Sequence, residues 1–336
     1  MARREQFNVN QLTVGSINGH PFPGGIGMGK AHYVAATSSS TSKYRDWLVS
    51  NGVNPSDIYS TVNLAYAATV DYRNDVIFVT PEVHTLTADL TWAKNHTHLV
   101  GLGGPAVESD YSVGGCTITS VGTASVFNIN ITGHRNQFHN VCLDQHAAAA
   151  GALTACQVSS YGNYFENVHF IGQMTDEADT VTTSSSLQMH TYSGFSIFKN
   201  CVIGSPLWAV RGTAKNAVIR FTNTSGATLP QDILFQGCRI FSNSATATQP
   251  AVALEANNAV DRLLEFRDCT FYNFQSNLGS VLTSGVFRDA CGTTHMILLS
   301  GSTCQYGWSD WADVHTYIYA VGPTASATGG TAVVTA

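Results

Sequence analysis

The chain has 336 residues, of which 44% are hydrophobic and only 11% are charged. An average soluble domain carries roughly 25% charged residues, so a long-helix or coiled-coil protein, which is rich in Glu, Lys and Arg, is excluded. The apolar content and a net charge of −6 also argue against a disordered chain. With 16 basic and 22 acidic residues, the composition provides no electrostatic case for binding nucleic acid.

The amino-terminal segment, residues 1–29, is rich in glycine and proline and has no sustained hydrophobic period. This pattern predicts an extended arm that a partner orders, with a terminus lacking fixed structure as the alternative. Its candidate contact residues are Arg3, Arg4, Phe7 and Phe22. No apolar run follows the paired arginines, so we expect no signal peptide, and no run in the chain is long enough to predict a transmembrane helix.

Residues 30–75 are predicted to form a capping segment. A short strand over residues 32–35 and a short helix over residues 44–49 are separated by a polar run. Apolar residues then recur at helical spacing over residues 57–70, which predicts an amphipathic helix. Residues 75–81 follow as a buried strand that a proline ends.

From about residue 76 to 305 the chain repeats one short pattern. The pattern is Phe-x-[Asn/Gly/Asp]-[Val/Cys]-x-apolar, and it occurs five times at intervals of 27 to 37 residues. A unit of this length cannot bury its apolar face alone, so neighbouring units are predicted to stack on one another. Phe and Val or Cys point inward, and the residue after Phe points outward. The third position holds residues that tolerate left-handed backbone, which predicts two short strands meeting at a sharp corner.

Stacking of these units predicts columns of equivalent residues. The interior columns contain Phe138, Phe165, Phe198, Phe235 and Phe266, and beside them Val141, Val168, Cys201, Cys238 and Cys269. A corner column contains Asn140, Asn167 and Asn200, whose amides are predicted to form a hydrogen-bonded ladder. The outward column has mixed charges, and we interpret it as a solvated face with one weak ion pair between Glu166 and Lys199. The eight cysteines lack a C-x-x-C pair and are predicted to be buried thiols.

These columns predict an all-β protein, a single-stranded right-handed parallel β-helix with a short N-terminal capping helix and extended terminal arms. The predicted organisation is an arm over residues 1–29, a capping segment over 30–75, the β-helix over 76–305 and a C-terminal cap or interface tail over 306–336.

The chain resembles the pectin-lyase-like right-handed β-helix proteins. Residues 75–84 are similar to the strand, Pro-Gly and Tyr with which that family enters its first coil, although Glu82-Val83 replaces the Gly and His84 replaces the Tyr. Residues 90–94 and 98–104 resemble the first full coil. The resemblance covers roughly residues 57–305 and implies that the helix over 57–70 covers the open end of the rod.

The same architecture serves polysaccharide lyases, tailspike depolymerases, adhesins and virion surface proteins of tailed bacteriophages. The amino arm, the Ser/Thr/Asn/Gly-rich composition and the lack of a predicted signal peptide are most similar to the phage virion proteins. This resemblance implies a capsid decoration (cement) protein on the capsid surface that binds the major capsid protein and forms a homotrimer. Two alternatives remain: a tailspike-like polysaccharide depolymerase or lyase, and a non-enzymatic adhesin that binds a host surface glycan.

Catalytic chemistry has little support in the sequence. A depolymerase needs paired carboxylates, and a lyase needs a cation-binding carboxylate cluster. No two acids occupy equivalent positions of adjacent units, and the acidic run at residues 176–179 is interpreted as a solvated loop, with a cation site as the alternative. His96 and His98 lie two apart on a predicted strand without a third metal ligand. We therefore predict no catalytic residue, no cofactor and no metal site.

The tail is rich in aromatic residues. Tyr306, Trp308, Trp311, Tyr317 and Tyr319 occur within a short span. We expect a cap or a subunit interface here, with Trp308, Trp311 and Tyr317 as candidate contacts to the capsid or to another subunit. A carbohydrate-binding platform is the alternative.

Overall fold

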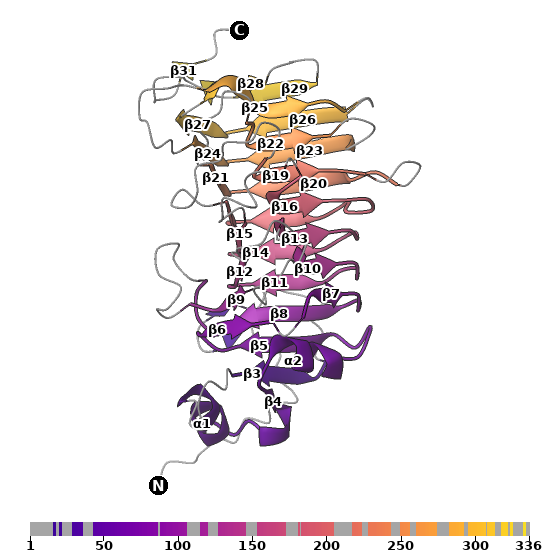
Figure 1. Cartoon of the computed structure of the whole chain (residues 1–336), viewed down its shortest axis with the longest axis vertical. Helices are drawn as coiled ribbons and strands as arrows, with labels where there is room; N and C mark the ends of the chain where they lie inside the picture. The colour runs from indigo at the N-terminus through magenta and orange to yellow at the C-terminus, as the bar shows by residue number, and fades with distance from the viewer. Residues whose placement is uncertain are drawn as a thin grey trace.

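A computed structural model describes residues 16–17, 20–21, 29–35, 43–86, 88–105, 115–119, 127–145, 153–172, 181, 183–204, 217–223, 228–242, 249–255, 260–273, 282–291, 295–306, 308–312, 317–321, 323–324 and 332–333. The chain is an all-β right-handed parallel β-helix, and it forms a rod with the two termini at opposite ends (Figure 1). Each turn of the rod, here called a coil, adds one strand to each of three parallel sheets. The sheets are named I, II and III in their order within a coil, and the chain enters the rod through sheet II.

Sheet I has eight strands: β7 (Leu90–Trp92), β10 (Phe127–Ile131), β13 (Thr154–Val158), β16 (Ser185–Met189), β19 (Ile219–Phe221), β22 (Val252–Leu254), β25 (Leu282–Asp289) and β28 (Trp308–Ala312). Sheet II has eleven: β4 (Ile58–Tyr59), β3 (Ala31–Val34), β5 (Asp75–Val79), β8 (Thr97–Gly101), β11 (Gln137–His139), β14 (Tyr164–Glu166), β17 (Ile197–Lys199), β20 (Gln231–Gln236), β23 (Asp261–Arg267), β26 (His295–Ser300) and β29 (Ile318–Val321). Sheet III has eight: β6 (Val83–Thr85), β9 (Thr117–Thr119), β12 (Cys142–Asp144), β15 (His169–Ile171), β18 (Val202–Ile203), β21 (Arg239–Ser242), β24 (Thr270–Asn273) and β27 (Thr303–Tyr306).

The sheets meet at corners that the chain turns in two different ways. From β11 on, the turn between sheets II and III is two residues long, as at Asn140-Val141 between β11 and β12. Between sheets I and II the turns are longer and vary in length from coil to coil. Figure 1 shows the strands of sheet III along the left-hand edge of the rod and the turns from sheet I into sheet II along the right-hand edge.

Helix α2 (Val62–Ala68) covers the amino-terminal end of the core. Its Val62, Ala65 and Tyr66 are buried, and the Tyr66 ring lies 4.6 Å from the ring of Trp92 in the first coil. The helix predicted over residues 57–70 starts later in the structure, because Ile58–Tyr59 pairs with β3 as a strand and the Thr61 hydroxyl accepts the backbone N–H of Leu64 as an N-cap.

The rest of the cap lies outside the end of the rod. Helix α1 (Lys43–Ser50) packs Leu48 against Ala35 and Ile58 in a small second core, and a 3₁₀ turn (η2, Pro55–Asp57) leads into β4. No helix among the residues described above is long and apolar enough to cross a membrane.

Buried Asp75 joins the cap to the first coil. Its carboxylate accepts two hydrogen bonds from the Arg73 guanidinium, at 2.6 and 2.7 Å, and one each from the backbone N–H groups of Lys30 and Val70, both at 2.7 Å. Burial raises the pKa of Asp75, but these hydrogen bonds outweigh burial and hold that pKa below its usual value. The charged form of Asp75 therefore connects β3, the end of α2 and β5.

The β-helix is longer than the sequence predicts. The predicted end at residue 305 is wrong, because β28 pairs in parallel with β25 and β29 pairs in parallel with β26, which extends the rod to Val321. A short antiparallel pair, β30 (Pro323–Thr324) and β31 (Ala332–Val333), follows. The predicted extended arm also contains a short antiparallel pair, β1 (Ser16–Ile17) and β2 (His20–Pro21).

Candidate functional site

The repeated phenylalanines form one column on the inner side of sheet II. All five are fully buried, and the ring centroids of successive coils lie 5.1, 4.6, 4.6 and 4.7 Å apart with interplanar angles of at most 13°. Parallel strands in register place equivalent side chains directly above one another, which favours this stacking. The column belongs to the core of the rod and has no surface through which it could bind a ligand.

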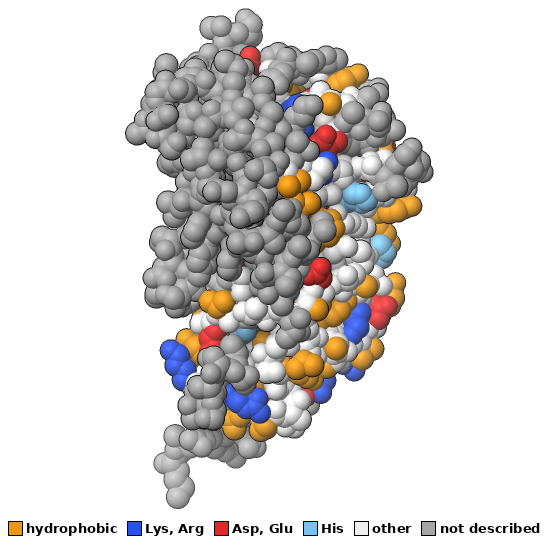
Figure 2. All heavy atoms as spheres, viewed as in Figure 1, with side chains coloured by type: hydrophobic (Ala, Val, Ile, Leu, Met, Phe, Trp, Pro, Cys, Tyr) orange, Lys and Arg blue, Asp and Glu red, His pale blue; other side chains and the backbone are white. Residues whose placement is uncertain are grey.

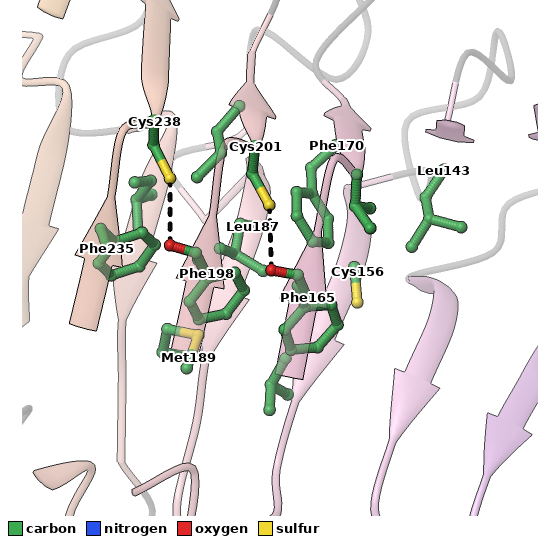
Figure 3. Close-up of a cluster of buried hydrophobic side chains, with 14 of the residues drawn as sticks. Leu143, Cys156, Phe165, Phe170, Leu187, Met189, Phe198, Cys201, Phe235 and Cys238 are labelled. Atoms are coloured by element: carbon green, nitrogen blue, oxygen red, sulfur yellow. Dashed lines mark hydrogen bonds between the residues drawn. The ribbon is translucent and has the colours of Figure 1, made fainter. Parts of the chain in front are cut away.

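The thiols of the second interior column each have a defined partner. The Sγ atoms of Cys201, Cys238 and Cys269 lie 3.7, 3.4 and 3.4 Å from the backbone carbonyl of the phenylalanine one coil earlier, as Figure 3 shows for the first two, and 3.5, 3.6 and 3.4 Å from the carbonyl two residues before each cysteine. All eight cysteines of the chain are free, and burial raises the pKa of Cys238 and Cys269. The Cys238 and Cys269 thiols are therefore neutral hydrogen-bond donors and poor nucleophiles.

The thiol column has two members that the sequence analysis missed. Cys116 donates to the carbonyl of Val79 at 3.4 Å, and the Ser302 hydroxyl donates to the carbonyl of Phe266 at 2.9 Å. Ser302 follows Gly301 as Cys238 follows Gly237, so the corner glycine was the signal that could have found it. Val141 and Val168 occupy the same column, are buried and lack a donor.

The II–III corner, defined by Asn140, Asn167, Asn200, Gly237, Asp268 and Gly301, has left-handed backbone at all six of these positions, with φ between 53° and 63°. The Asn167 Nδ2 donates to the Asn140 Oδ1 at 2.8 Å, which is one step of an asparagine ladder. A Cβ atom at Gly237 would lie 2.6 Å from the Asn200 Oδ1, so the Asn200 amide fills the space beside the next coil. The corner side chains therefore contact one another between successive coils.

The candidate contact residues of the tail are mostly inside the rod. Trp308 is fully buried and donates its indole N–H to the carbonyl of Gln249 at 3.2 Å, and Trp311 is 3% exposed and packs edge-on against Phe271. The prediction that these two tryptophans contact a capsid, another subunit or a carbohydrate is wrong, because β28 buries both side chains. Tyr317 is partly exposed, and its ring lies 4.6 Å from that of His295.

The candidate contacts of the arm, Arg3, Arg4, Phe7 and Phe22, lie outside the described residues. The acidic run at residues 176–179 lies outside them as well. His96 and His98 are not on one strand face, because His96 precedes β8 with left-handed backbone, at φ 52°, whereas His98 lies within β8 and is buried. Within the described ranges, no group of three or more His, Cys, Asp or Glu side chains is placed to hold a metal ion.

The outer side of sheet II brings together His139, Glu166 and Lys199. The Lys199 Nζ lies 3.0 Å from the Glu166 Oε1, which is the ion pair that the sequence predicts. The Tyr164 hydroxyl donates to the Glu166 Oε2 at 3.1 Å, and the His139 Nδ1 lies 3.8 Å from the same oxygen. The interpretation as a solvated face is wrong at His139, whose side chain is 5% exposed. Burial lowers the pKa of His139 to about 4, although Glu166 acts in the opposite direction.

The outer side of sheet I carries a polar row that the sequence analysis missed. Gln157 donates to the Asn130 Oδ1 at 3.1 Å, and Gln188 donates to the Gln157 Oε1 at 3.1 Å. Both glutamines are 7% exposed. Further along the rod, Glu255 accepts from Arg220 at 3.1 Å and from Arg288 at 2.9 Å. The row consists of Asn130, Gln157, Gln188, Arg220, Glu255 and Arg288. A period-two reading of the sheet I strands was the signal that could have found it.

Five carboxylates on the outside of the described part of the rod lie close to cations of the same chain. Besides Glu166 and Glu255, Glu265 lies 2.8 Å from Arg267, and Asp232 and Asp261 lie 3.5 and 3.8 Å from Arg262. Among the side chains that Figure 2 colours, the charged ones lie scattered over the visible face.

Comparison with known proteins supports the fold. No family model and no curated protein matches the chain. Among solved structures, a pectin methylesterase in complex with a hexasaccharide aligns with a TM-score of 0.50 and 15% identity over 91% of this chain and 85% of its own. Pectate lyase Pel9A aligns with a TM-score of 0.50 and 13% identity over 84% of this chain and 64% of its own.

A third solved structure, the ORF18 protein of Geobacillus virus E2, aligns with a TM-score of 0.41 and 14% identity over 74% of this chain and 54% of its own. At these identities the likeness to pectin methylesterase and pectate lyase extends to the parallel β-helix fold and no further.

Proposed function

We propose that the protein is a structural virion protein of a tailed bacteriophage, a capsid decoration (cement) protein that stabilises the head and projects from its surface. The observation that carries this proposal is the state of its ionisable groups. Glu166, Glu255 and Glu265 lie close to Arg or Lys, the thiols of the interior column are buried donors, and His139 is buried and neutral. Side chains paired or buried in this way support a rigid rod better than they support acid–base or nucleophilic chemistry.

The amino-terminal end of the rod is the proposed base. The arm directly precedes the cap in the sequence, and the cap lies at this end of the rod (Figure 1). The cap also exposes large apolar side chains: Trp47 is 44% exposed, Val49 41% and Leu64 54%. Exposed apolar groups of this kind favour contact with another protein, here the major capsid protein. A homotrimer on the capsid surface is part of the proposal.

Localisation in the native particle tests the proposal. Cryo-electron microscopy of the source virion is expected to place the rod on the head, with the cap toward the coat. Purified full-length protein is expected to co-sediment with heads that lack it, and loss of residues 1–29 or the double change Trp47→Ser and Leu64→Ser is expected to weaken co-sedimentation. The change Tyr319→Ser, at the opposite end of the rod, is the matched control. Detection of the protein only at the tail would contradict the proposal.

A second candidate function, polysaccharide depolymerisation or lysis, is favoured by the polar row on sheet I. The guanidinium groups of Arg220 and Arg288 beside Glu255 are suited to holding hydroxyl and carboxylate groups of a sugar chain, whereas the amides of Gln157 and Gln188 are buried. The two solved structures with a TM-score of 0.50 are named as pectin-acting enzymes. Release of reducing ends from host capsular polysaccharide, abolished by Glu255→Gln and retained by Glu265→Gln, would favour this function over the decoration function.

A further inference from the structure

One face of the rod carries a line of exposed apolar side chains. Within the described ranges, most of the large apolar residues with high exposure lie on the turns that lead into sheet II and on the adjoining outer side of that sheet. In Figure 2, hydrophobic and histidine side chains lie next to one another along the right-hand edge of the rod, where Figure 1 shows these turns. We define the apolar stripe as Val70, Tyr72, Tyr161, Tyr192, Phe195, Ile197 and Met296.

The stripe is continuous from coil to coil. The Tyr72 and His96 rings lie 5.6 Å apart, and the backbone N–H of His96 donates to the carbonyl of His134 in the next coil. The His134 ring stacks on Tyr161 at 4.1 Å. The backbone N–H that follows Tyr161 donates to the carbonyl of Gly194, one coil further along. Ring contacts and backbone hydrogen bonds therefore connect the stripe along the rod axis, starting at the cap.

Three aromatic members of the stripe are held on strained backbone. Tyr72 is 65% exposed, Phe195 52% and Tyr192 49%, and their φ angles are left-handed, at 59°, 56° and 68°. Left-handed φ brings the Cβ of an L-residue against its own backbone, and Gly162, on one of the same turns, demonstrates that glycine fits there. Backbone strain of this kind persists where the side chain that causes it has a function. For an exposed apolar ring, that function is contact with a partner.

The composition of the stripe is that of a protein interface. Its rings are accompanied by the exposed aliphatic side chains of Val70, Ile197 and Met296. Exposed Arg135 lies just before β11, and exposed Arg262 lies at the start of β23, in the same line. Interface cores are enriched in aromatic residues, Met and Arg, and aliphatic side chains make the patch contiguous. These residue types therefore favour a protein as the occupant of the stripe.

The length of the stripe restricts the kind of protein partner. From β5 to β26 the strands of sheet II span roughly 35 Å at about 4.8 Å per coil, and a strand of six residues is about 20 Å long. The product, about 700 Å², is close to the roughly 800 Å² that each partner buries in a standard interface. The stripe runs away from the cap, so a coat protein that binds the cap does not cover it. A second rod of the same length does.

We propose that the apolar stripe is the surface through which copies of this chain pack side by side and parallel. The inference rests on the proposed function, in which every subunit of the homotrimer stands on its cap, so the same heights of neighbouring rods meet. At one such height Asp232 and Asp261 lie 3.5 and 3.8 Å from Arg262, and all three side chains are partly exposed. Arg262 of one copy can therefore pair with these carboxylates of the next, which makes the charges of the stripe self-complementary.

Analytical ultracentrifugation of the full-length protein tests the inference. The unchanged protein is expected to sediment with the mass of three chains at micromolar concentration. The double change Tyr161→Ser and Ile197→Ser removes two apolar side chains of the stripe and is expected to raise the dissociation constant of the assembly at least about tenfold. The matched control, Trp47→Ser with Leu64→Ser, removes two exposed apolar side chains of the cap and is expected to leave the mass unchanged.

A second variant separates assembly from folding. Phe195→Gly removes a ring of the stripe and relieves left-handed strain, so it is expected to weaken assembly while it raises the unfolding midpoint of protein dilute enough to be monomeric. The inference is overturned if the unchanged protein is a monomer, if the stripe variants assemble as it does, or if the cap variant dissociates equally. Electron micrographs that show caps at both ends of the assembly would also overturn it.

Co-sedimentation with heads, measured on the same samples, distinguishes this inference from the proposed function. A parallel assembly that dissociates on change of the stripe but does not bind heads supports the inference and contradicts the decoration function. A monomer that binds heads through its cap supports the decoration function and overturns the inference.

Discussion

The II–III corner and the I–II corner have the same left-handed backbone but different residues. At the II–III corner, Asn140, Asn167 and Asn200 are followed by Gly, Asp and Gly, which adopt this conformation readily. At the I–II corner, formed by the turns from sheet I into sheet II, the same φ range is occupied by His96, Arg135 and Phe195. The first corner turns its side chains toward neighbouring coils, as the 2.8 Å bond between Asn167 and Asn140 illustrates. The second turns them toward solvent.

The difference shows that left-handed backbone at a corner can have two causes: the type of residue, or the hydrogen bonds to neighbouring coils. At the short II–III corner, the residues are of the types that adopt left-handed backbone readily, so the corner can be recognised in the sequence. Where the turns are long and hydrogen-bonded to the coils on either side, the backbone is imposed by those bonds, and the residue is free to be chosen for another purpose. Four predictions test this view, from the largest expected effect to the smallest.

Acidification is expected to destabilise the protein at His139, beside the II–III corner. His139 directly precedes Asn140, and burial lowers its pKa in the folded state to about 4. Between pH 6.5 and 4 the unfolded chain binds a proton that the folded chain excludes, so the free energy of unfolding falls as the pH falls through this window. The expected loss at pH 4 is on the order of 3 kcal/mol.

Urea unfolding at pH 7 and pH 4 measures the total loss, to which His98 also contributes because burial lowers its pKa to about 3. His139→Gln is expected to remove about 3 kcal/mol of the total. His134, next to the I–II corner, is partly exposed, so His134→Gln is the matched control and is expected to remove little. An equal effect of the two changes would break the comparison between the corners.

Alanine in place of glycine compares the two corners directly. A Cβ at Gly237 would lie 2.6 Å from the Asn200 Oδ1, whereas a Cβ at Gly162 would meet only the Arg135 Cγ, at 3.4 Å. Both changes incur left-handed strain of roughly 1 kcal/mol, and Gly237→Ala also displaces the Asn200 amide. Chemical denaturation is expected to give losses of about 2 to 3 kcal/mol for Gly237→Ala and about 1 kcal/mol for Gly162→Ala. A larger loss at Gly162 would reverse the assignment of the tight corner.

The asparagine ladder can be divided into its two contributions. Asn167→Gly removes the bond to Asn140 and leaves the backbone unstrained, for an expected loss of about 1 kcal/mol. Asn167→Ala removes the bond and adds left-handed strain, for about 2 kcal/mol. Equilibrium unfolding in guanidinium chloride measures both losses. Equal losses would mean that the backbone of this corner does not depend on the residue type.

Glycine at the I–II corner is expected to stabilise the fold slightly. Phe195→Gly relieves strain of about 1 to 2 kcal/mol and increases the entropy of the unfolded chain by about 0.5 to 1 kcal/mol, so a net gain of about 0.5 kcal/mol follows. Calorimetry measures the shift of the unfolding midpoint. Ile197→Gly, two residues away on extended backbone in β17, is the matched control and is expected to lower the midpoint. A lower midpoint for both variants would argue against strain at Phe195.

Much of the interior could be predicted because its signals are local. The alternation in Phe-x-Asn-Val defines which side chains point inward, and a corner residue that tolerates left-handed backbone marks where sheet II ends. The capping helix over 57–70 was predicted in the correct place but with the wrong start, because the pairing of Ile58–Tyr59 with β3 is a tertiary contact.

The sequence by itself determined the repeat, and through it the parallel β-helix, the phenylalanine stack and the thiol column, because each of these follows from residue type and a period of two. Only the tertiary structure decided which aromatic residues face solvent: β28 buries Trp308 and Trp311, while the I–II corner exposes Tyr161 and Phe195. It also decided the pairing of Glu255 with Arg220 and Arg288, which lie 35 and 33 residues away. These outcomes depend on how many residues each coil inserts between its strands, and no local pattern encodes that number.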